Sequence, residues 1–158
     1  MEGNKTGEKA QSSFELLITL AFGLVILIPI VVIAFVQIAN SNASLASVEA
    51  QQAANKLSSV ATLIGSEGPP ARQLVQVSVP EGVKSIYIGN TNNGVGHEII
   101  FVIVAPINLS YITAYTPVNV SGNLSTLTSQ GTYLINVTAT GQCQSNLNLS
   151  CVYLSPVT

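Results

Sequence analysis

Apolar residues run almost without a break from Leu16 to Ala39. The stretch is interrupted only by Thr19, Gly23, Pro29 and Gln37. A helix that spans a bilayer needs about 20 apolar residues, whereas the apolar region of a cleaved secretory signal has about 7 to 15. No small-x-small cleavage site closes the stretch, so we expect this helix to remain in the mature protein. Pro29 removes a backbone donor near its middle, which predicts either a kinked membrane anchor or a flexible point used when the helix changes environment.

The lysines around this stretch predict its orientation in a membrane. Lys5 and Lys9 precede it, and the next positive residue along the chain is Lys56. Positive residues flank membrane helices mainly on the cytoplasmic side. We therefore expect a membrane-inserted precursor whose N-terminus is cytoplasmic and whose C-terminal part lies outside the cell.

After Ala39 the pattern becomes amphipathic. Apolar residues recur at steps of three and four, at Leu45, Val48, Ala53, Leu57, Val60, Ala61 and Ile64. This spacing predicts an apolar stripe on a surface helix, which we expect to pack against the chain's own sheet. Gly65 is the expected C-cap, and Gly68-Pro69-Pro70 ends the helix. The predicted helix covers residues 11–65, hydrophobic over 11–39 and amphipathic over 40–65, and a linker covers 66–73.

From Leu74 onward the hydrophobic period becomes two. Strands are predicted at residues 74–79, 83–88, 98–105, 108–115, 117–120, 132–139 and 149–154. Turn signals separate them, among them Pro80-Glu81-Gly82 and Asn93-Gly94. Six or seven short strands with regular turns predict a small antiparallel sandwich over residues 74–158. The expected fold class is α+β, with a long N-terminal hydrophobic helix followed by this β domain.

Charge is scarce in this chain and unevenly placed. Charged residues make up 8% of it, against about 25% in an average soluble domain. Residues 99–158 contain no Asp, Glu, Lys or Arg. Five Lys and Arg in all are too few for a basic nucleic-acid binder, and one His with two Cys is too little for a metal hydrolase. His97 lies in a Gly-rich stretch and is expected to be a solvated loop residue, so the composition favours a surface or assembly protein over an enzyme, without metal or cofactor.

The two cysteines lie close together near the C-terminus. Cys143 and Cys151 enclose a short loop. If this half of the chain lies outside the cell, a disulfide between them is expected, and the alternative is a pair of free, buried thiols.

Asn-x-Ser/Thr sequons are denser than the Asn, Ser and Thr content predicts by chance. The six expected on the external side begin at Asn42, Asn108, Asn119, Asn123, Asn136 and Asn148. A seventh begins at Asn4, on the expected cytoplasmic side, and should stay unmodified. N-glycosylation of an exposed surface would also hydrate a domain that lacks charges.

The residues just before the apolar stretch carry two interpretations. Ser12-x-x-Glu15 is a capping box, with Ser12 as N-cap and Glu15 bonding back to its amide. Glu15 is also the only carboxylate attached to the long apolar helix. Ionisable groups in such positions are costly and usually paired, so Glu15 is a candidate functional residue.

This junction resembles that of archaeal type IV pilin-like proteins with a class III signal peptide. Their motif is Gln-x-Ser-x-Glu-x-x-x-Leu, preceded by Lys and a small residue. The matching residues are Lys9, Ala10, Gln11, Ser13 and Glu15, and Thr19 stands at the position of the final Leu. The resemblance implies that a prepilin peptidase recognises the motif and cuts between Ala10 and Gln11, which makes residues 1–10 a leader. It also implies that Glu15 guides assembly by pairing with the N-terminal amine of a neighbouring subunit.

The same resemblance implies a function and a set of partners. The expected function is a structural subunit of an adhesive extracellular filament, in a helical polymer with itself. The expected fold has the lollipop shape of pilins, and the expected partners are the prepilin peptidase, a pilus assembly ATPase, a membrane platform and the membrane before assembly, with no nucleic acid. Two alternatives remain, a membrane-anchored or minor pilin-like ligand-binding protein and an archaellin-like motility subunit.

Overall fold

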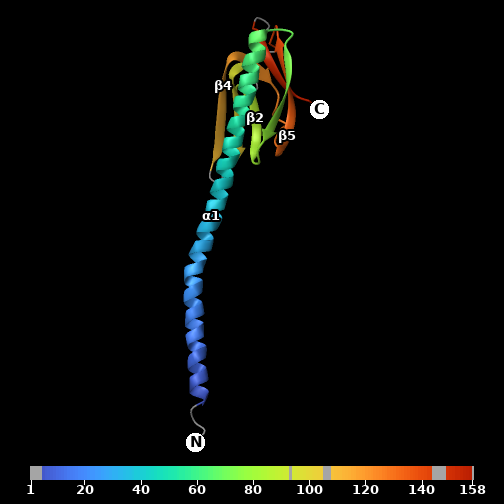
Figure 1. The fold of residues 1–158 in the computed structure, drawn as a ribbon. Coiled ribbons are helices and arrows are strands. Elements are labelled where there is room, and N and C mark those ends of the chain that lie inside the picture. Colours follow the sequence, from blue (N-terminus) through green and yellow to red (C-terminus); the bar gives the residue numbers. More distant parts are fainter. Residues whose placement is uncertain (1–4, 93, 105–107, 144–148, 158) are drawn as a thin grey trace. The chain divides into compact units, whose positions relative to one another are not determined.

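The computed structural model describes residues 5–92, 94–104, 108–143 and 149–157, with side chains from Phe14 onward. The chain divides into two units, Met1–Ser41 and Asn42–Thr158. Helix α1 covers Lys5–Glu67. The strands are β1 (Arg72–Val79), β2 (Val83–Gly89), β3 (Gly96–Val104), β4 (Leu109–Gly122), β5 (Gly131–Thr140) and β6 (Cys151–Pro156), and Figure 1 labels several of them. The chain is therefore α+β, with a long apolar N-terminal helix followed by strands.

The first part of α1 is apolar over a length that suits a bilayer. Among the described residues, α1 is the one helix long and apolar enough to cross a membrane, with a mean hydropathy of 3.1 over its most apolar window. The helix continues through Pro29. It also begins at Lys5, so Ser12 lies inside the helix, and the predicted capping box is wrong for the uncleaved chain. Ser12 has no helix end to cap because the helix extends to its N-terminal side.

The glycine that caps the C-terminal end of α1 is not the predicted one. Gly68 has φ 72°, and its N–H donates to the carbonyl of Ile64 at 3.1 Å, so Gly68 caps the helix that ends at Glu67. Gly65, the expected cap, lies inside the helix. The predicted linker over 66–73 is correspondingly shorter, because β1 already begins at Arg72.

The six strands form one mixed sheet in the order β1-β5-β6-β4-β3-β2. Neighbours pair antiparallel except β4 and β6, which pair parallel through Val120↔Val152 and the two residue pairs that follow. The predicted antiparallel sandwich is wrong in this respect. The strands predicted at 108–115 and 117–120 form a single long strand, β4, which pairs with β3 along its first part and with β6 along its last.

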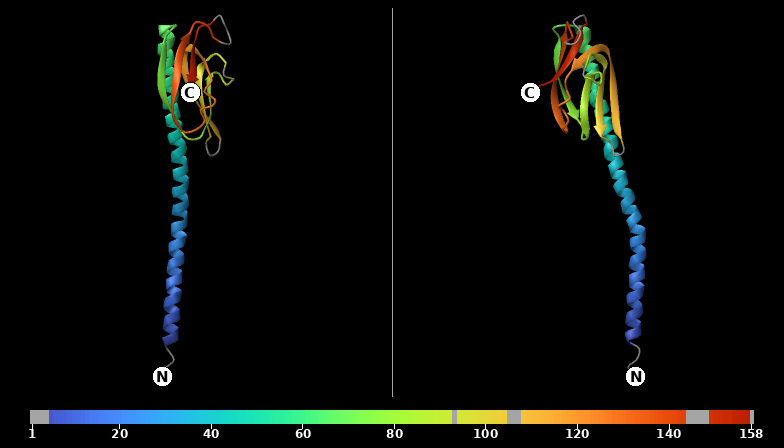
Figure 2. Two further views of the ribbon diagram at one scale, coloured as in Figure 1. Left: turned by 90° about the vertical axis from the view of Figure 1, so that its right-hand side faces the viewer. Right: turned by 180° about the vertical axis from the view of Figure 1, so that it is seen from behind.

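The second layer of the β unit is the helix itself. Residues 42–67 of α1 lie along one side of the sheet (Figure 2). The buried helix residues are Ala50, Ala53, Ala54, Leu57, Ala61 and Ile64. They share one core cluster with strand residues such as Val77, Ile86 and Phe101. The expected packing of the amphipathic half against the sheet is confirmed, and the many alanines let the helix approach the strands closely.

Two side chains of α1 also bond directly to strand backbone. Lys56 Nζ donates to the carbonyl of Gln76 at 2.8 Å, and Ser58 Oγ donates to the carbonyl of Tyr115 at 2.6 Å. The first bond satisfies an acceptor on the edge strand β1, where unpaired backbone groups invite unwanted strand pairing. The second fixes β4 against the helix.

Candidate functional site

The helix segment before residue 42 exposes its apolar side chains on every side. The large apolar side chains from Phe14 to Ile38 are between 41% and 70% exposed. No face of this segment is polar enough to serve as a solvent face, and a helix that is apolar all round must be buried in lipid or among other helices. The segment is therefore the candidate assembly surface of the chain.

Glu15 lies at the N-terminal end of this apolar segment and is exposed. Thr19 Oγ1 donates to the Glu15 carbonyl at 2.7 Å, a bond that engages the backbone and not the carboxylate. Gly23 is open as well, because a Cβ built there meets nothing within 4 Å. A small residue at such a position allows another helix to come close.

The residues of the processing motif lie in the first turns of α1. Lys9, Ala10, Gln11 and Ser13 have helical backbone. Their side chains lie outside the described residues, so the structure shows the helical location of the expected cleavage bond and not its surroundings.

The C-terminal cysteines form the expected disulfide. Cys143 and Cys151 are joined, with their Cα atoms 5.4 Å apart, and both are buried. The Cys143 N–H donates to the carbonyl of Leu149, and Thr140 Oγ1 donates to that of Cys151, both at 2.8 Å. These bonds attach the loop to the start of β6 and to the neighbouring strand β5.

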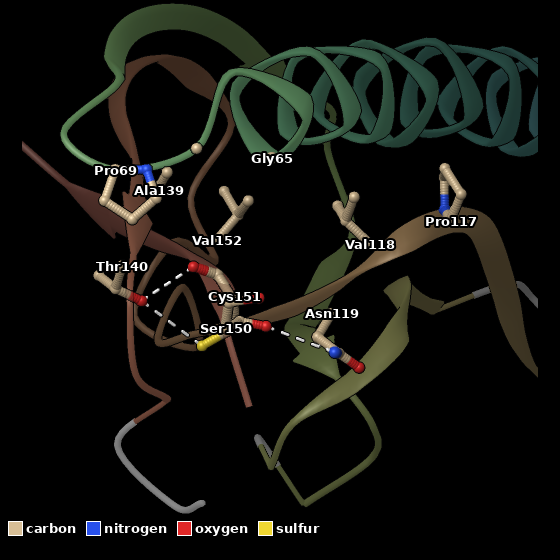
Figure 3. A pocket seen from close by; sticks show the side chains of 11 residues that line it. Gly65, Pro69, Pro117, Val118, Asn119, Ala139, Thr140, Ser150, Cys151 and Val152 are labelled. Carbon is tan, nitrogen blue, oxygen red and sulfur yellow. Dashed lines mark hydrogen bonds between the residues drawn. The ribbon is translucent and has the colours of Figure 1, made fainter. Parts of the chain in front are cut away.

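A small pocket of about 180 Å³ lies between this disulfide and the end of α1 (Figure 3). Gly65 and Pro69 border it from the helix side, and Val118 and Asn119 border it from β4. Gly65 must lack a side chain here, because a Cβ would lie 2.8 Å from Val118 Cγ1. The pocket is smaller than the usual volume of a pocket for a drug-sized ligand. We therefore interpret it as imperfect packing at the corner of the sheet.

At that corner β4 forms a large bulge opposite β3. Glu98 pairs with Tyr115, but Gly96, two residues earlier on β3, pairs with Val120. The residues between include Thr116, fully buried, whose Oγ1 donates to the carbonyl of Val118 at 2.7 Å. A proline in a strand, here Pro117, is the sequence signal for such a bulge.

His97 holds this bulge from β3. Its Nδ1 lies 3.1 Å from the Thr116 carbonyl oxygen and 3.2 Å from that of Val118. Both oxygens can only accept, so Nδ1 carries the proton. His97 is half-buried in β3, and the prediction of a solvated loop residue is wrong, because the bulge of a distant strand supplies its partners.

The sequons differ in how accessible they are. Asn42, Asn108 and Asn123 are exposed, whereas Asn119 and Asn136 are half-buried in β4 and β5. Asn4 and Asn148 lie outside the described residues. Asn123 Oδ1 accepts bonds from the Ser125 N–H at 3.2 Å and the Ser125 hydroxyl at 2.6 Å. Of the described sequons, Asn123 therefore combines exposure with a contact between its amide and the sequon hydroxyl.

Within the described part of the chain, no group of three or more His, Cys, Asp or Glu residues is arranged to hold a metal ion. No protein-family model matches the chain, and no curated protein or solved structure matches it. Function is therefore inferred from the exposed helix and the exterior of the sheet.

Proposed function

We propose that this protein is the structural subunit of an extracellular type IV pilus-like filament that serves in adhesion. It would assemble through the N-terminal helix after a prepilin peptidase cleaves between Ala10 and Gln11. The observation that carries this proposal is the helix segment from Phe14 to Ile38, which exposes apolar side chains on all sides, while the unit Asn42–Thr158 has a core of its own.

Such a helix has two environments that bury it equally well. Lipid covers it in the membrane, and neighbouring helices cover it at the centre of a filament. Transfer between the two changes little apolar burial, so the subunit can wait in the bilayer and then join the fibre. Glu15 makes the transfer favourable, because a charge in an apolar setting gains most from an opposite charge on the next subunit.

The β unit would form the outside of the filament. Its sheet buries one face against α1 and leaves sequons such as Asn108 and Asn123 exposed. Glycans on these residues would supply hydration that the uncharged strands cannot.

The test is to shear surface filaments from the source cells and determine the N-terminus and structure of their subunit. We expect the subunit to begin at Gln11 and the helix to lie at the filament centre by cryo-electron microscopy. Replacing Ala10 by Phe should leave the uncleaved chain in membranes, while Ala43→Phe, which has no place in the motif, serves as control. A wild-type chain found only in membranes with Met1 intact would contradict the proposal and favour a membrane-anchored protein.

A further inference from the structure

Two exposed tyrosines mark the sheet face that is turned away from the core. Tyr111 and Tyr115 on β4 are 62% and 67% exposed. They alternate with Ile112 and Ala114, which belong to the core or pack against it. On β3, Val102 is the register partner of Tyr111 and Ile100 is that of Thr113, and they are only 3% and 5% exposed. Buried apolar residues of the neighbouring strand therefore lie next to this part of β4.

Although Tyr115 is exposed, both its ring and its backbone have fixed partners. Its ring stacks on His97, with ring centroids 5.7 Å apart and planes 28° from parallel. The His97 ring is itself fixed by the two bulge carbonyls at its Nδ1. The Tyr115 backbone is fixed from the other side of the sheet, by the Ser58 hydroxyl. A large aromatic surface fixed before contact loses little conformational entropy when a partner binds.

The strands that carry the rings contain few charged side chains. From residue 99 to residue 158 there is no charged side chain, and Glu98, the register partner of Tyr115, is the only formally charged residue within β3 and β4. Nucleic acids and anionic lipid surfaces are bound through clusters of Lys and Arg, and β3 and β4 contain neither residue. Tyr rings combine an apolar face with a hydroxyl, and the exposed Thr113 between them adds a third hydroxyl.

We infer that Tyr115 and Tyr111 form a platform that binds neutral sugar rings of a polysaccharide on another surface. A pyranose presents C–H groups from one face, which pack on an aromatic ring, and hydroxyls at its rim, which bond to Tyr and Thr. Four residues along a strand separate the two tyrosines by about 13 Å, so one extended oligosaccharide reaches both. This inference deepens the proposed adhesive function and rests on it, since it names the class of adhesive ligand.

The test measures retention of purified filaments on immobilised neutral polysaccharides, namely a β-glucan, an α-mannan and a galactan. Heparin serves as the charged comparison, and the detergent-solubilised full chain replaces filaments if none form. We expect wild-type retention on a neutral polymer that survives high salt, because no charge takes part. Tyr115→Ala should weaken it about tenfold, the loss of about 1.4 kcal/mol. Tyr115→Phe, which keeps the ring and loses only the hydroxyl, should weaken it less than Tyr115→Ala does. Leu74→Ala, at another exposed residue on β1, should change it little.

The outcomes separate this inference from the proposed function. No retention on any neutral polymer, or equal retention of the wild type and Tyr115→Ala, overturns the platform even if filaments form normally. Filaments that fail to form with Tyr115→Ala but form with Leu74→Ala show that a second copy of the chain covers this face, which also overturns it. Binding that appears only after Asn108→Gln assigns the face to the chain's own glycan and overturns it too. If the source cells form no filaments but the detergent-solubilised chain is retained on a neutral polysaccharide, the result supports the platform and contradicts the filament.

Discussion

The two parts of α1 both carry apolar side chains, but these side chains are exposed in the first part and buried against the strands in the second. Between Phe14 and Ile38 every large apolar side chain is exposed, whereas between Ala50 and Ile64 the stripe that faces the strands is fully buried. The second part packs against strands of the same chain, whereas among the described residues the first part buries none of its large apolar side chains. The difference teaches that the second part folds with its own chain, and it supports the proposal that lipid or other subunits cover the first part.

Glu15 allows the most drastic test of the first part. Glu15→Ala should permit leader cleavage but abolish incorporation into filaments, because the apolar helix would then lack the charge that we propose to pair with a neighbouring N-terminal amine. Glu67→Ala, an exposed carboxylate at the other end of α1, is the matched control and should assemble normally. The measurement is electron microscopy of sheared filaments with immunoblotting of the membrane pool. Normal filaments from Glu15→Ala would refute the pairing role.

A pair of identical substitutions tests the comparison itself. Leu57→Ala removes a side chain with no exposed surface and should lower the free energy of unfolding of the β unit by about 2–5 kcal/mol. Leu27→Ala removes one that is 55% exposed and should leave that free energy unchanged. Denaturant unfolding of both variants in detergent, followed by circular dichroism, measures the difference. Equal losses would mean that the two parts of α1 are not independent.

The disulfide is expected to contribute the next largest effect. Replacing both Cys143 and Cys151 by Ser should lower the stability of the β unit by about 2–3 kcal/mol, since a short closed loop restricts the unfolded chain. Assembly through the N-terminal helix should be unaffected at moderate temperature. Thermal unfolding with and without reductant tests this. A wild-type unfolding temperature that stays the same when reductant is added would contradict it.

Two glycines provide a smaller and more local contrast. Gly65→Ala places a methyl group 2.8 Å from Val118 and should destabilise the β unit by about 1–2 kcal/mol, after the helix-favouring effect of Ala is subtracted. Gly23→Ala meets nothing within the chain and should not destabilise it, yet it should loosen filaments if neighbouring helices cross there. Urea unfolding measures the first effect, and shear resistance of filaments measures the second. A stable Gly65→Ala variant would show that Val118 moves aside freely.

Local patterns in the sequence predicted most elements and few of the long-range pairings. The apolar stretch, the amphipathic half and the strands from Arg72 to Gly89 follow from periodicity and turn residues. The helix end was misplaced because Gly65 and Gly68 look alike in sequence, and only contact with Val118 distinguishes a packing glycine from a cap. The parallel pairing of β4 with β6, which replaces the expected sandwich, has no local signal.

The candidate functional residues also fall into those that local sequence predicts and those that depend on long-range pairing. The apolar helix and the disulfide could be predicted from sequence, because each depends on residue type and spacing, whereas the role of Glu15 stays a prediction. The His97–Tyr115 stack could not, because it forms only when the β4 bulge brings Thr116 and Val118 to the histidine. A lone His beside glycines resembles a solvated loop residue until that bulge is known.

The smallest expected effect locates the border between the two parts of α1. Val48 fits the amphipathic stripe by spacing, yet it is 52% exposed, whereas Ala50 two residues later is fully buried. Val48→Ser should therefore change the free energy of unfolding by less than about 0.5 kcal/mol, as exposed substitutions do. If neighbouring subunits cover the helix up to this residue, the same variant should make filaments depolymerise at lower denaturant concentration than the wild type. Ser59→Ala, on an exposed part of the same helix, is the control. Wild-type filament stability in Val48→Ser would place the border before Val48, whereas a large loss of monomer stability would mean that Val48 belongs to the core.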